Sequence, residues 1–279
     1  RIFELRQRCH QPDVSTSLQQ PVAACPRVRS VADAMSALSE QGACILEDCG
    51  TSYDDAASLP QRLFGSRLLA APPPAEISDS ILAGRGIVKG ETFPAHTDGH
   101  AYGELFPDCF MLLCARDCAE GGGNFLIDGY QVLESLAAEP LTSWVPTALE
   151  MRAVDQTSRL PSVSPVVLRA PSGRRALRCR LSGPPRAFSA QRVAESSDDP
   201  EADAAMLHAY HSAVEHAASM APRVHLRPGD ALVVDNYRMF HGRDSFVDAD
   251  RLLWRVWVWT EDVRGVPTGE LNSTPGDVA

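Results

Sequence analysis

The sequence predicts a mainly β fold, a barrel or jelly-roll core with helices packed on its outside. Two features indicate this class. Many short apolar runs rich in Val, Leu, Ile and Trp are separated by Gly and Pro turns. Few segments repeat apolar residues at helical spacing. A chain of 279 residues is within the range of one large barrel or sandwich, so we expect a single domain over 1–279.

Helices are expected where apolar residues recur every three to four positions. The clearest is 203–220, in which Met206, Tyr210 and Ala217 share one helical face. Similar patterns predict helices over 31–41, 54–64 and 129–138. Because these few helices are separated by strand-like runs, we expect them to pack outside the β core.

Strands are expected where aliphatic, β-branched and aromatic residues form short runs bounded by turns. The longest run is 252–260, which is rich in Val and Trp. A turn at 227–230 leads into another run at 231–234. The remaining strands are expected at 44–46, 110–114, 124–127, 166–168 and 175–181.

Two ranges have the composition of loops. The range 66–95 contains the stiff segment Pro72–Pro74 and glycines at positions 84, 86 and 90. The range 182–202 opens with two prolines and is polar and acidic. We expect both ranges to form lids or surface loops, the first of them near a site.

Charge and apolar content exclude several kinds of partner. With a formal net charge of -10, the chain repels phosphate backbones, so nucleic acid is not an expected partner. No apolar run reaches the ~18 residues of a membrane span, and the start of the chain is too charged for a secretory signal. The eight cysteines form no CxxC pair, which favours free thiols in a cytoplasmic protein. The oligomeric state cannot be inferred from the sequence.

The segment His96-Thr97-Asp98 is the first candidate for chemistry. In a strand, residues i and i+2 point to the same side, so the imidazole and the carboxylate could chelate one metal ion. This short motif is common by chance, and a third ligand must come from elsewhere. His241 follows a strand-and-turn segment from which its side chain can point inward.

His96, Asp98 and His241 together would place two imidazoles and one carboxylate on one side of a metal ion. Such a set leaves positions open for a chelating cosubstrate and O2, which suits non-haem iron(II). Zinc with a bound water can use a similar set. The ligands alone therefore do not determine the metal.

Arginines at two places could bind an anionic group. Arg251 and Arg255 share a strand face, and their apolar neighbours indicate burial. A buried guanidinium can hold a carboxylate through two parallel hydrogen bonds. A second group is either a solvated strand edge or a contact for an anionic substrate; it consists of Arg174, Arg175, Arg178 and Arg180.

These motifs occur in the order seen in the taurine dioxygenase family. They are His96-Thr97-Asp98, Gly121-Gly122-Gly123-Asn124, His241-Gly242-Arg243 and Arg251-x-x-x-Arg255. Over about residues 88–260, the chain is similar to TauD/TfdA-like and γ-butyrobetaine hydroxylase-like enzymes. The resemblance implies a double-stranded β-helix (jelly-roll) core and a dioxygenase that depends on Fe(II) and 2-oxoglutarate and consumes O2.

The resemblance also implies roles for individual residues. The three candidate ligands would bind the iron, and 2-oxoglutarate would chelate it through its 1-carboxylate and keto oxygen. Arg251 would hold the distal carboxylate of the cosubstrate. Arg255 would contact the cosubstrate or, as in some relatives, an anionic substrate. Asn124 stands where relatives often have Thr, and its amide can donate to the same carboxylate.

The substrate is expected to be a small molecule, and the arginines suggest that it is anionic. In the resembled family, residues near the metal-binding strand often line the substrate. The candidates here are Arg255, Thr92, Phe93, His100, Tyr102 and Arg85.

The expected activity is hydroxylation of a small metabolite or natural-product intermediate at an unactivated C–H bond, with succinate and CO2 as co-products. The same iron site could instead desaturate, epimerise or cyclise its substrate. Two alternatives from other classes are a non-catalytic metal-binding jelly roll and a zinc hydrolase. The arginine pair Arg251 and Arg255 argues against the first alternative, and the second would not depend on 2-oxoglutarate.

Overall fold

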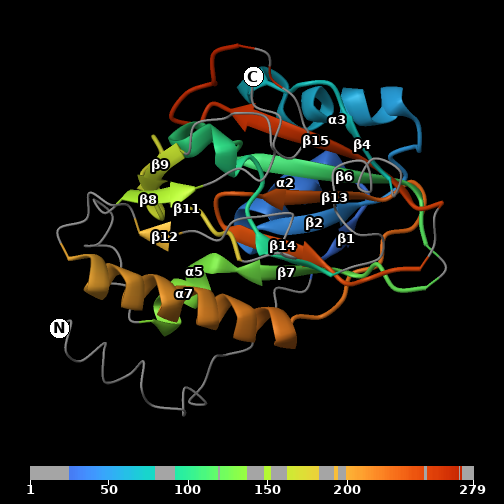
Figure 1. Ribbon diagram of the computed structural model, residues 1–279. Coiled ribbons are helices and arrows are strands. Elements are labelled where there is room, and N and C mark those ends of the chain that lie inside the picture. The colour runs from blue at the N-terminus through green and yellow to red at the C-terminus, as the bar shows by residue number, and fades with distance from the viewer. Residues whose placement is uncertain are drawn as a thin grey trace.

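Two facing β-sheets with helices on their outer sides form the core of the protein (Figure 1). The computed structural model describes residues 25–78, 92–118, 120–136, 148–151, 162–181, 192–193, 199–247, 250–269 and 271. This arrangement is a jelly roll, so the fold class predicted from the sequence is confirmed.

The larger sheet has seven strands among the described residues. Six follow one another in the order β1-β2-β13-β6-β15-β3, and β4 also pairs with β15. The pair β1 and β2 is parallel, and the other pairs are antiparallel. The strands are β1 (Arg27–Val28), β2 (Ala43–Leu46), β3 (Leu68–Ala70), β4 (Ala75–Ser78), β6 (Cys109–Arg116), β13 (Ala231–Asp235) and β15 (Leu252–Thr260).

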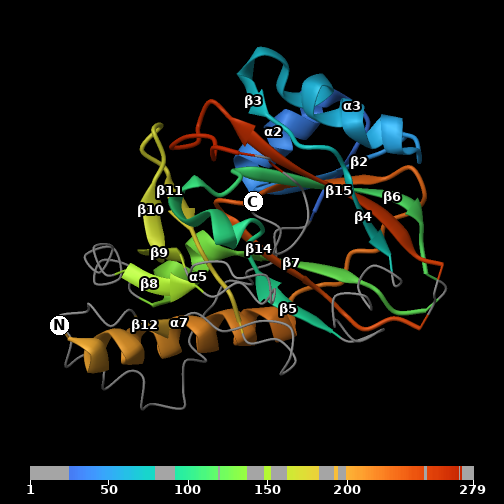
Figure 2. The same ribbon diagram turned by 45° about the horizontal axis from the view of Figure 1, so that its top comes forward.

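The smaller sheet has the order β5-β14-β7, with β5 (Phe93–His96), β14 (Met239–Arg243) and β7 (Asn124–Asp128). The extended segment 178–181 continues this sheet beyond β5, because its backbone bonds to residues 95–97. Figure 2 shows the three strands beside one another, with a long helix along their outer side.

Helices cover both outer faces. The larger sheet is covered by α2 (Val31–Gln41) and α3 (Tyr53–Phe64), and the smaller sheet by α5 (Gly129–Ser135) and α7 (Pro200–Met220) (Figure 1). Capping residues define where they begin: the Ser52 side chain accepts a hydrogen bond from the backbone of Asp55 in α3. The remaining elements are η1 (Gly65–Arg67), η2 (His100–Leu105), β8 (Ala148–Met151), β9 (Ser162–Pro165), β10 (Val167–Arg169), β11 (Arg175–Leu177) and β12 (Arg192–Val193).

Among the described residues, buried apolar side chains form three clusters, arranged in layers. The inner cluster lies between the sheets and contains Phe110 and Trp257. A second cluster fills the space between the larger sheet and its helices and contains Met111. A third lies between the smaller sheet and α7, with Phe240 and Tyr210. Because successive side chains of a strand point to opposite faces, cluster membership shows which side chains reach the interior.

The expected helices and strands are present, with shifted ends. The helix expected over 203–220 begins earlier, at Pro200, because Asp199 caps it and proline is favoured in a first turn. It therefore begins inside the range 182–202, which was expected to be a loop. The range 66–95 likewise contains β3, β4 and β5. The rest of these ranges, at 79–91, 182–191 and 194–198, lies outside the described residues.

No helix in the described part of the chain is both long enough and apolar enough to span a membrane. This finding agrees with the absence of a long apolar run in the sequence.

Candidate functional site

His96 and His241 lie directly opposite each other on neighbouring strands of the smaller sheet. The register of β5 and β14 pairs these two residues, so their side chains project from the same face. The centroids of their rings are 4.1 Å apart. The adjacent residues Ala95 and Phe240 belong to the cluster under α7. The two imidazoles therefore face the interior between the sheets.

Asp98 follows β5 in a turn that Asn236 holds in place. The backbone N of Asp98 donates to Oδ1 of Asn236 at 2.9 Å, and Nδ2 of Asn236 donates to the carbonyl oxygens of Asp98 at 3.0 Å and Pro107 at 2.7 Å. The carboxylate is thereby placed with Oδ1 3.4 Å from Nε2 of His96 and 3.9 Å from Nε2 of His241.

The three side chains fit a metal ion. One donor atom from each of His96, Asp98 and His241 lies within 4.8 Å of the other two, and all three residues are buried. Nδ1 of His96 is 2.9 Å from the carbonyl oxygen of Pro94. In the tautomer that donates this hydrogen bond, the lone pair of Nε2 faces Asp98. Two imidazoles and one carboxylate on a common side suit iron(II), with the opposite positions open.

The electrostatics of the site favour metal binding as well. Burial alone would raise the pKa of Asp98, but the Arg255 guanidinium and the two histidines outweigh it and hold this pKa well below its usual range. Burial, and then the neighbouring His96, hold the pKa of His241 well below its usual value. Both shifts favour the forms that bind metals, an ionised carboxylate and a neutral imidazole.

Two side chains of β15 contact the Asp98 carboxylate from the larger sheet. Nη1 of Arg255 donates to Oδ1 at 3.1 Å and to Oδ2 at 3.3 Å, and Nε1 of Trp257 donates to Oδ2 at 2.7 Å. Trp257 was predicted only as part of the strand over 252–260, so its contact with Asp98 was missed. The alternation of β15 could have indicated it, because Trp257 shares a face with Arg255.

Arg251 lies just before β15 and beside the triple-glycine turn. Its Nη2 donates to the carbonyl oxygen of Gly122 at 3.4 Å. Gly122 has a φ of 70°, which favours glycine. A Cβ there would lie 3.3 Å from Nε of Arg251 and 2.5 Å from Sγ of Cys118. A glycine at this position therefore makes room for the guanidinium. Asn124 begins β7 two residues later, so the expected cosubstrate residues meet at one turn.

A further buried guanidinium, that of Arg243, lies at the same end of the sheet. Arg243 is paired with Asn124 across β14 and β7. The guanidinium carbons of Arg243 and Arg251 lie 4.4 Å and 5.2 Å from the centroid of the Phe246 ring. The cationic character of this end exceeds what the sequence motifs indicated, because no role was assigned to Arg243.

Two of the expected substrate residues are close to the ligands. The ring of Phe93 packs edge-on against His96, with centroids 4.5 Å apart. Tyr102 is buried, and its ring centroid is 6.1 Å from that of Trp257. Both residues thus border the metal ligands or the side chain that contacts Asp98.

The other expected substrate residues are placed differently. Arg255 contacts Asp98, as described above. Thr92 is exposed and directly precedes β5. Arg85 and the side chain of His100 lie outside the described residues. Among the described members of the set, the structure brings Phe93, Tyr102 and Arg255 to the site and leaves Thr92 exposed.

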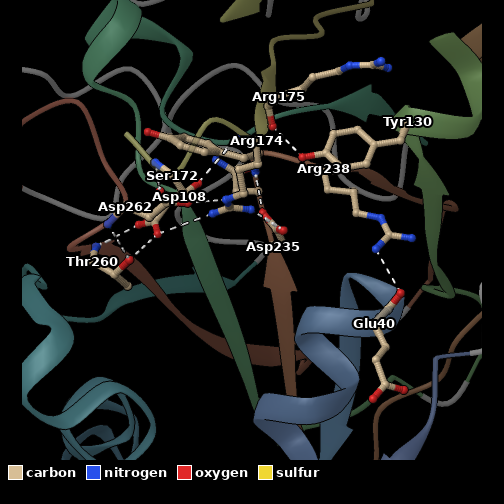
Figure 3. A network of polar contacts seen from close by, with 12 residues as sticks. Glu40, Asp108, Tyr130, Ser172, Arg174, Arg175, Asp235, Arg238, Thr260 and Asp262 are labelled. Atoms are coloured by element: carbon tan, nitrogen blue, oxygen red, sulfur yellow. Dashed lines mark hydrogen bonds and ion pairs between the residues drawn. The ribbon is translucent and has the colours of Figure 1, made fainter. Parts of the chain in front are cut away.

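The arginines at 174–180 do not form one surface patch. Arg174 makes an ion pair with Asp235 at 2.5 Å, in a polar network shown in Figure 3. Arg178 and Arg180 are buried, with 0% and 2% of their surface exposed. For these two residues, the interpretation as a solvated strand edge is wrong, because the segment pairs with the metal-binding strand.

The jelly roll and its buried His-Asp-His set define a non-haem iron oxygenase. A family model described as "Taurine catabolism dioxygenase TauD, TfdA family" matches residues 15–257. The chain belongs to this family. It is a 2-oxoglutarate-dependent dioxygenase, with Fe(II) as its metal and 2-oxoglutarate and O2 as cosubstrates.

Solved structures with the same fold include an asparagine oxygenase in complex with Fe(II), 2S,3S-3-hydroxyasparagine and succinate. It is 18% identical, with a TM-score of 0.58, over 83% of this chain and 79% of that chain. PvcB from Pseudomonas aeruginosa is 18% identical, with a TM-score of 0.55, over 82% and 80% of the two chains. OrfP in complex with Fe, succinate and (3S)-hydroxy-L-Arg is 16% identical, with a TM-score of 0.56, over 84% and 80%.

Proposed function

We propose that the protein hydroxylates a small metabolite at an unactivated C–H bond, with iron held by His96, Asp98 and His241. The observation that supports this assignment is the convergence of the three buried donor atoms within 4.8 Å. Bound iron(II) supplies the oxidation of the substrate by O2, coupled to conversion of 2-oxoglutarate into succinate and CO2. The same site is also compatible with desaturation, epimerisation or cyclisation, which differ in the fate of the substrate.

Arg251 is the proposed partner of the distal carboxylate of 2-oxoglutarate, with Asn124 beside it. Burial lowers the pKa of Arg251, and a guanidinium removed from water gains most from an anionic partner. Arg255 contacts Asp98 and borders the same interior, so we assign it to the cosubstrate or the substrate. Arg255 and Trp257 orient the Asp98 carboxylate, and the buried surroundings exclude water from it.

The substrate is proposed to be a small molecule with an anionic group. The asparagine oxygenase and OrfP, which share the fold, were both solved with hydroxylated amino acids. A similar metabolite or a natural-product intermediate suits the interior of this chain. We also propose that residues 1–279 form one domain. A cytoplasmic location is supported by the free thiols of the described cysteines.

Release of succinate from 2-oxoglutarate by anaerobically iron-loaded protein, after exposure to air, tests this function. Asp98→Ala is expected to abolish iron binding and succinate release. Arg251→Ala should keep iron and weaken 2-oxoglutarate binding by about 10- to 100-fold, because a charge-assisted bond is lost. Arg169→Ala, at an exposed position of β10, is the matched control and should behave like the wild type.

The wild type can be slow without its substrate, so iron and 2-oxoglutarate binding are also titrated directly. A wild type that binds neither would contradict the proposed function. An activity that requires zinc and ignores 2-oxoglutarate would favour a hydrolase instead.

A further inference from the structure

Arg180 lies next to His96 on the smaller sheet. The two residues form an antiparallel bridge, and the neighbouring backbone N of Thr97 donates to the carbonyl oxygen of Cys179 at 2.9 Å. Residues directly opposite each other in an antiparallel pair project from the same face of the sheet. The side chain of Arg180 therefore projects from the face that carries the His96 imidazole.

The residues on either side of Arg180 confirm this direction. Cys179 and Leu181 belong to the cluster under α7, as does Ala95, which precedes His96. Side chains alternate along extended segments, so Arg180 points the other way, into the interior between the sheets.

Arg180 and Arg251 lie on opposite sides of the two metal-binding imidazoles. Across the smaller sheet the order is Arg180, His96, His241 and Leu126. Arg251 lies at the turn that precedes β7, at the far side of this order. A cosubstrate that reaches from iron to Arg251 extends toward β7, away from Arg180. Arg180 consequently borders the side of the metal that remains for the substrate.

The charge of Arg180 favours an anion on that side. Only 2% of its surface is exposed, and a guanidinium stays protonated in proteins. The negative charge of Asp98 attracts the Arg180 guanidinium. The same carboxylate also accepts hydrogen bonds from Arg255 and is a proposed ligand of the metal ion. A planar carboxylate matches the two parallel donors of a guanidinium, which makes it the best-suited partner.

We propose that Arg180 binds a carboxylate of the substrate and so selects small carboxylic acids, amino acids among them, and orients them at the metal. This inference rests on the proposed function, because it requires iron and 2-oxoglutarate at the neighbouring positions. It makes Arg180 a specificity-determining residue, distinct from the arginines of the recognised motif.

Matched pairs of small ligands test the proposal. Glycine, propionate and N-acetyl amino acids are compared with the corresponding carboxamides, which differ in one charge. Binding to the anaerobic Fe(II)–2-oxoglutarate protein is followed through the visible absorption of the iron–cosubstrate chelate. The wild type should bind at least one carboxylate about tenfold or more tightly than its amide. Arg180→Gln should lose this preference and bind 2-oxoglutarate within about twofold of the wild type.

Two further variants control for net charge and for folding. Arg169→Gln removes the same charge from an exposed position and should keep the preference. Arg180→Lys keeps the positive charge but lacks the planar guanidinium, so it should keep part of the preference for carboxylates. If Arg180→Gln does not fold, a crystal structure of the wild type with the best carboxylate is decisive. The carboxylate should lie within hydrogen-bond distance of Arg180.

The proposal is overturned if no carboxylate binds, if amides bind equally well, if Arg180→Gln keeps the preference, or if the crystal shows the carboxylate elsewhere. A wild type that fails to bind 2-oxoglutarate would instead count against the proposed function. The two failures are therefore distinguishable.

Discussion

Nε1 of Trp257 donates a 2.7 Å hydrogen bond to Oδ2 of Asp98. The indole belongs to the larger sheet and is 2% exposed, whereas Asp98 follows a strand of the smaller sheet. The bond thus joins the two sheets at a proposed metal ligand. A carboxylate fixed in this way needs little reorientation when a metal binds.

Trp257→Phe is expected to weaken iron binding by about 10- to 100-fold, because the carboxylate loses an oriented donor while the core keeps an aromatic ring. Anaerobic titration with Fe(II), or with Co(II) as a spectroscopic substitute, measures this change. The loss should appear in metal affinity before it appears in folding.

Trp259→Phe is the control for this substitution. Nε1 of Trp259 donates to the carbonyl oxygen of Leu105 at 2.8 Å and not to the metal ligands. This variant should lose about 1 kcal/mol of stability and keep its iron affinity. Equal iron affinities of the two variants would show that the bond to Asp98 is not functionally important.

Gly242 follows His241 in β14, between two paired strands. A Cβ at this position would lie 2.5 Å from the carbonyl oxygen of Phe93 and would overlap the ring of Phe125. Gly242→Ala should therefore cost about 1 to 3 kcal/mol of unfolding free energy and weaken iron binding, because β5 and β14 must separate. Chemical denaturation and metal titration measure the two effects.

Gly265→Ala is the matched control for Gly242→Ala. Its Cβ would meet only Cδ2 of Leu105, at 3.3 Å, the end of a side chain that can move. If Gly265→Ala lowered the free energy of unfolding and the iron affinity as much as Gly242→Ala, the close contact between β5 and β14 at Gly242 would have no special role.

Local pattern was sufficient to predict most elements of the fold. The range 252–260 expected from its Val and Trp content coincides with β15, and 31–41 coincides with α2. In contrast, residues 93–95 of β5 (Phe93–His96) were expected in a loop, and the strand expected through His96-Thr97-Asp98 ends at His96, with Asp98 in the turn that follows. Strand β5 contains Pro94, and it is held by β14, whose residues are more than a hundred positions away in the chain. Pairing of this kind is decided by tertiary contacts, which a local pattern does not contain.

The same distinction applies to the candidate site. His96, Asp98 and His241 could be selected because their spacing and chemistry match a metal site. Asn236 and Trp257, which hold Asp98, could not, because they are 138 and 159 residues away from it in the chain. For Arg180, the sequence left surface and substrate contact open, and burial against β5 excludes the surface.

Asp108 should give the protein a pH-dependent stability. Its carboxylate accepts hydrogen bonds from N and Oγ1 of Thr260 at 2.9 Å and 2.5 Å, and it lies near Arg174, Asp235 and the phenol of Tyr237. Burial outweighs these donors and raises the pKa to about 6. Because the unfolded value is about 3.9, the folded state holds the proton more tightly. The Asp108 carboxyl therefore adds about 2 to 3 kcal/mol to the free energy of unfolding below pH ~4. This contribution is lost as the pH rises to about 6.

Asp108→Asn should remove this contribution, so the stability of the variant relative to the wild type should increase between pH ~4 and ~7. Denaturant unfolding at several pH values measures the difference.

Asp262→Asn provides a contrast of opposite sign. Although burial acts to raise the pKa of Asp262, its bonds to Arg174 and Ser172 lower it. Its contribution is therefore present above the unfolded pKa and is lost as pH falls. Parallel pH profiles for both variants would contradict the assignment.

Arg174 is expected to stabilise the end of the inner core through three carboxylates. Its guanidinium forms ion pairs with Asp235 at 2.5 Å and with Asp262, and lies 3.8 Å from Asp108 (Figure 3). Arg174→Gln leaves these carboxylates without their cation and should lower the free energy of unfolding by about 3 kcal/mol at pH ~7. This value is at the lower end of the usual range because the Arg174 side chain is 30% exposed. The loss should shrink near pH ~5, where Asp108 binds a proton.

Arg175→Gln is the control, because Figure 3 shows that side chain pointing away from the carboxylates. Equal losses in urea unfolding would refute this role for Arg174.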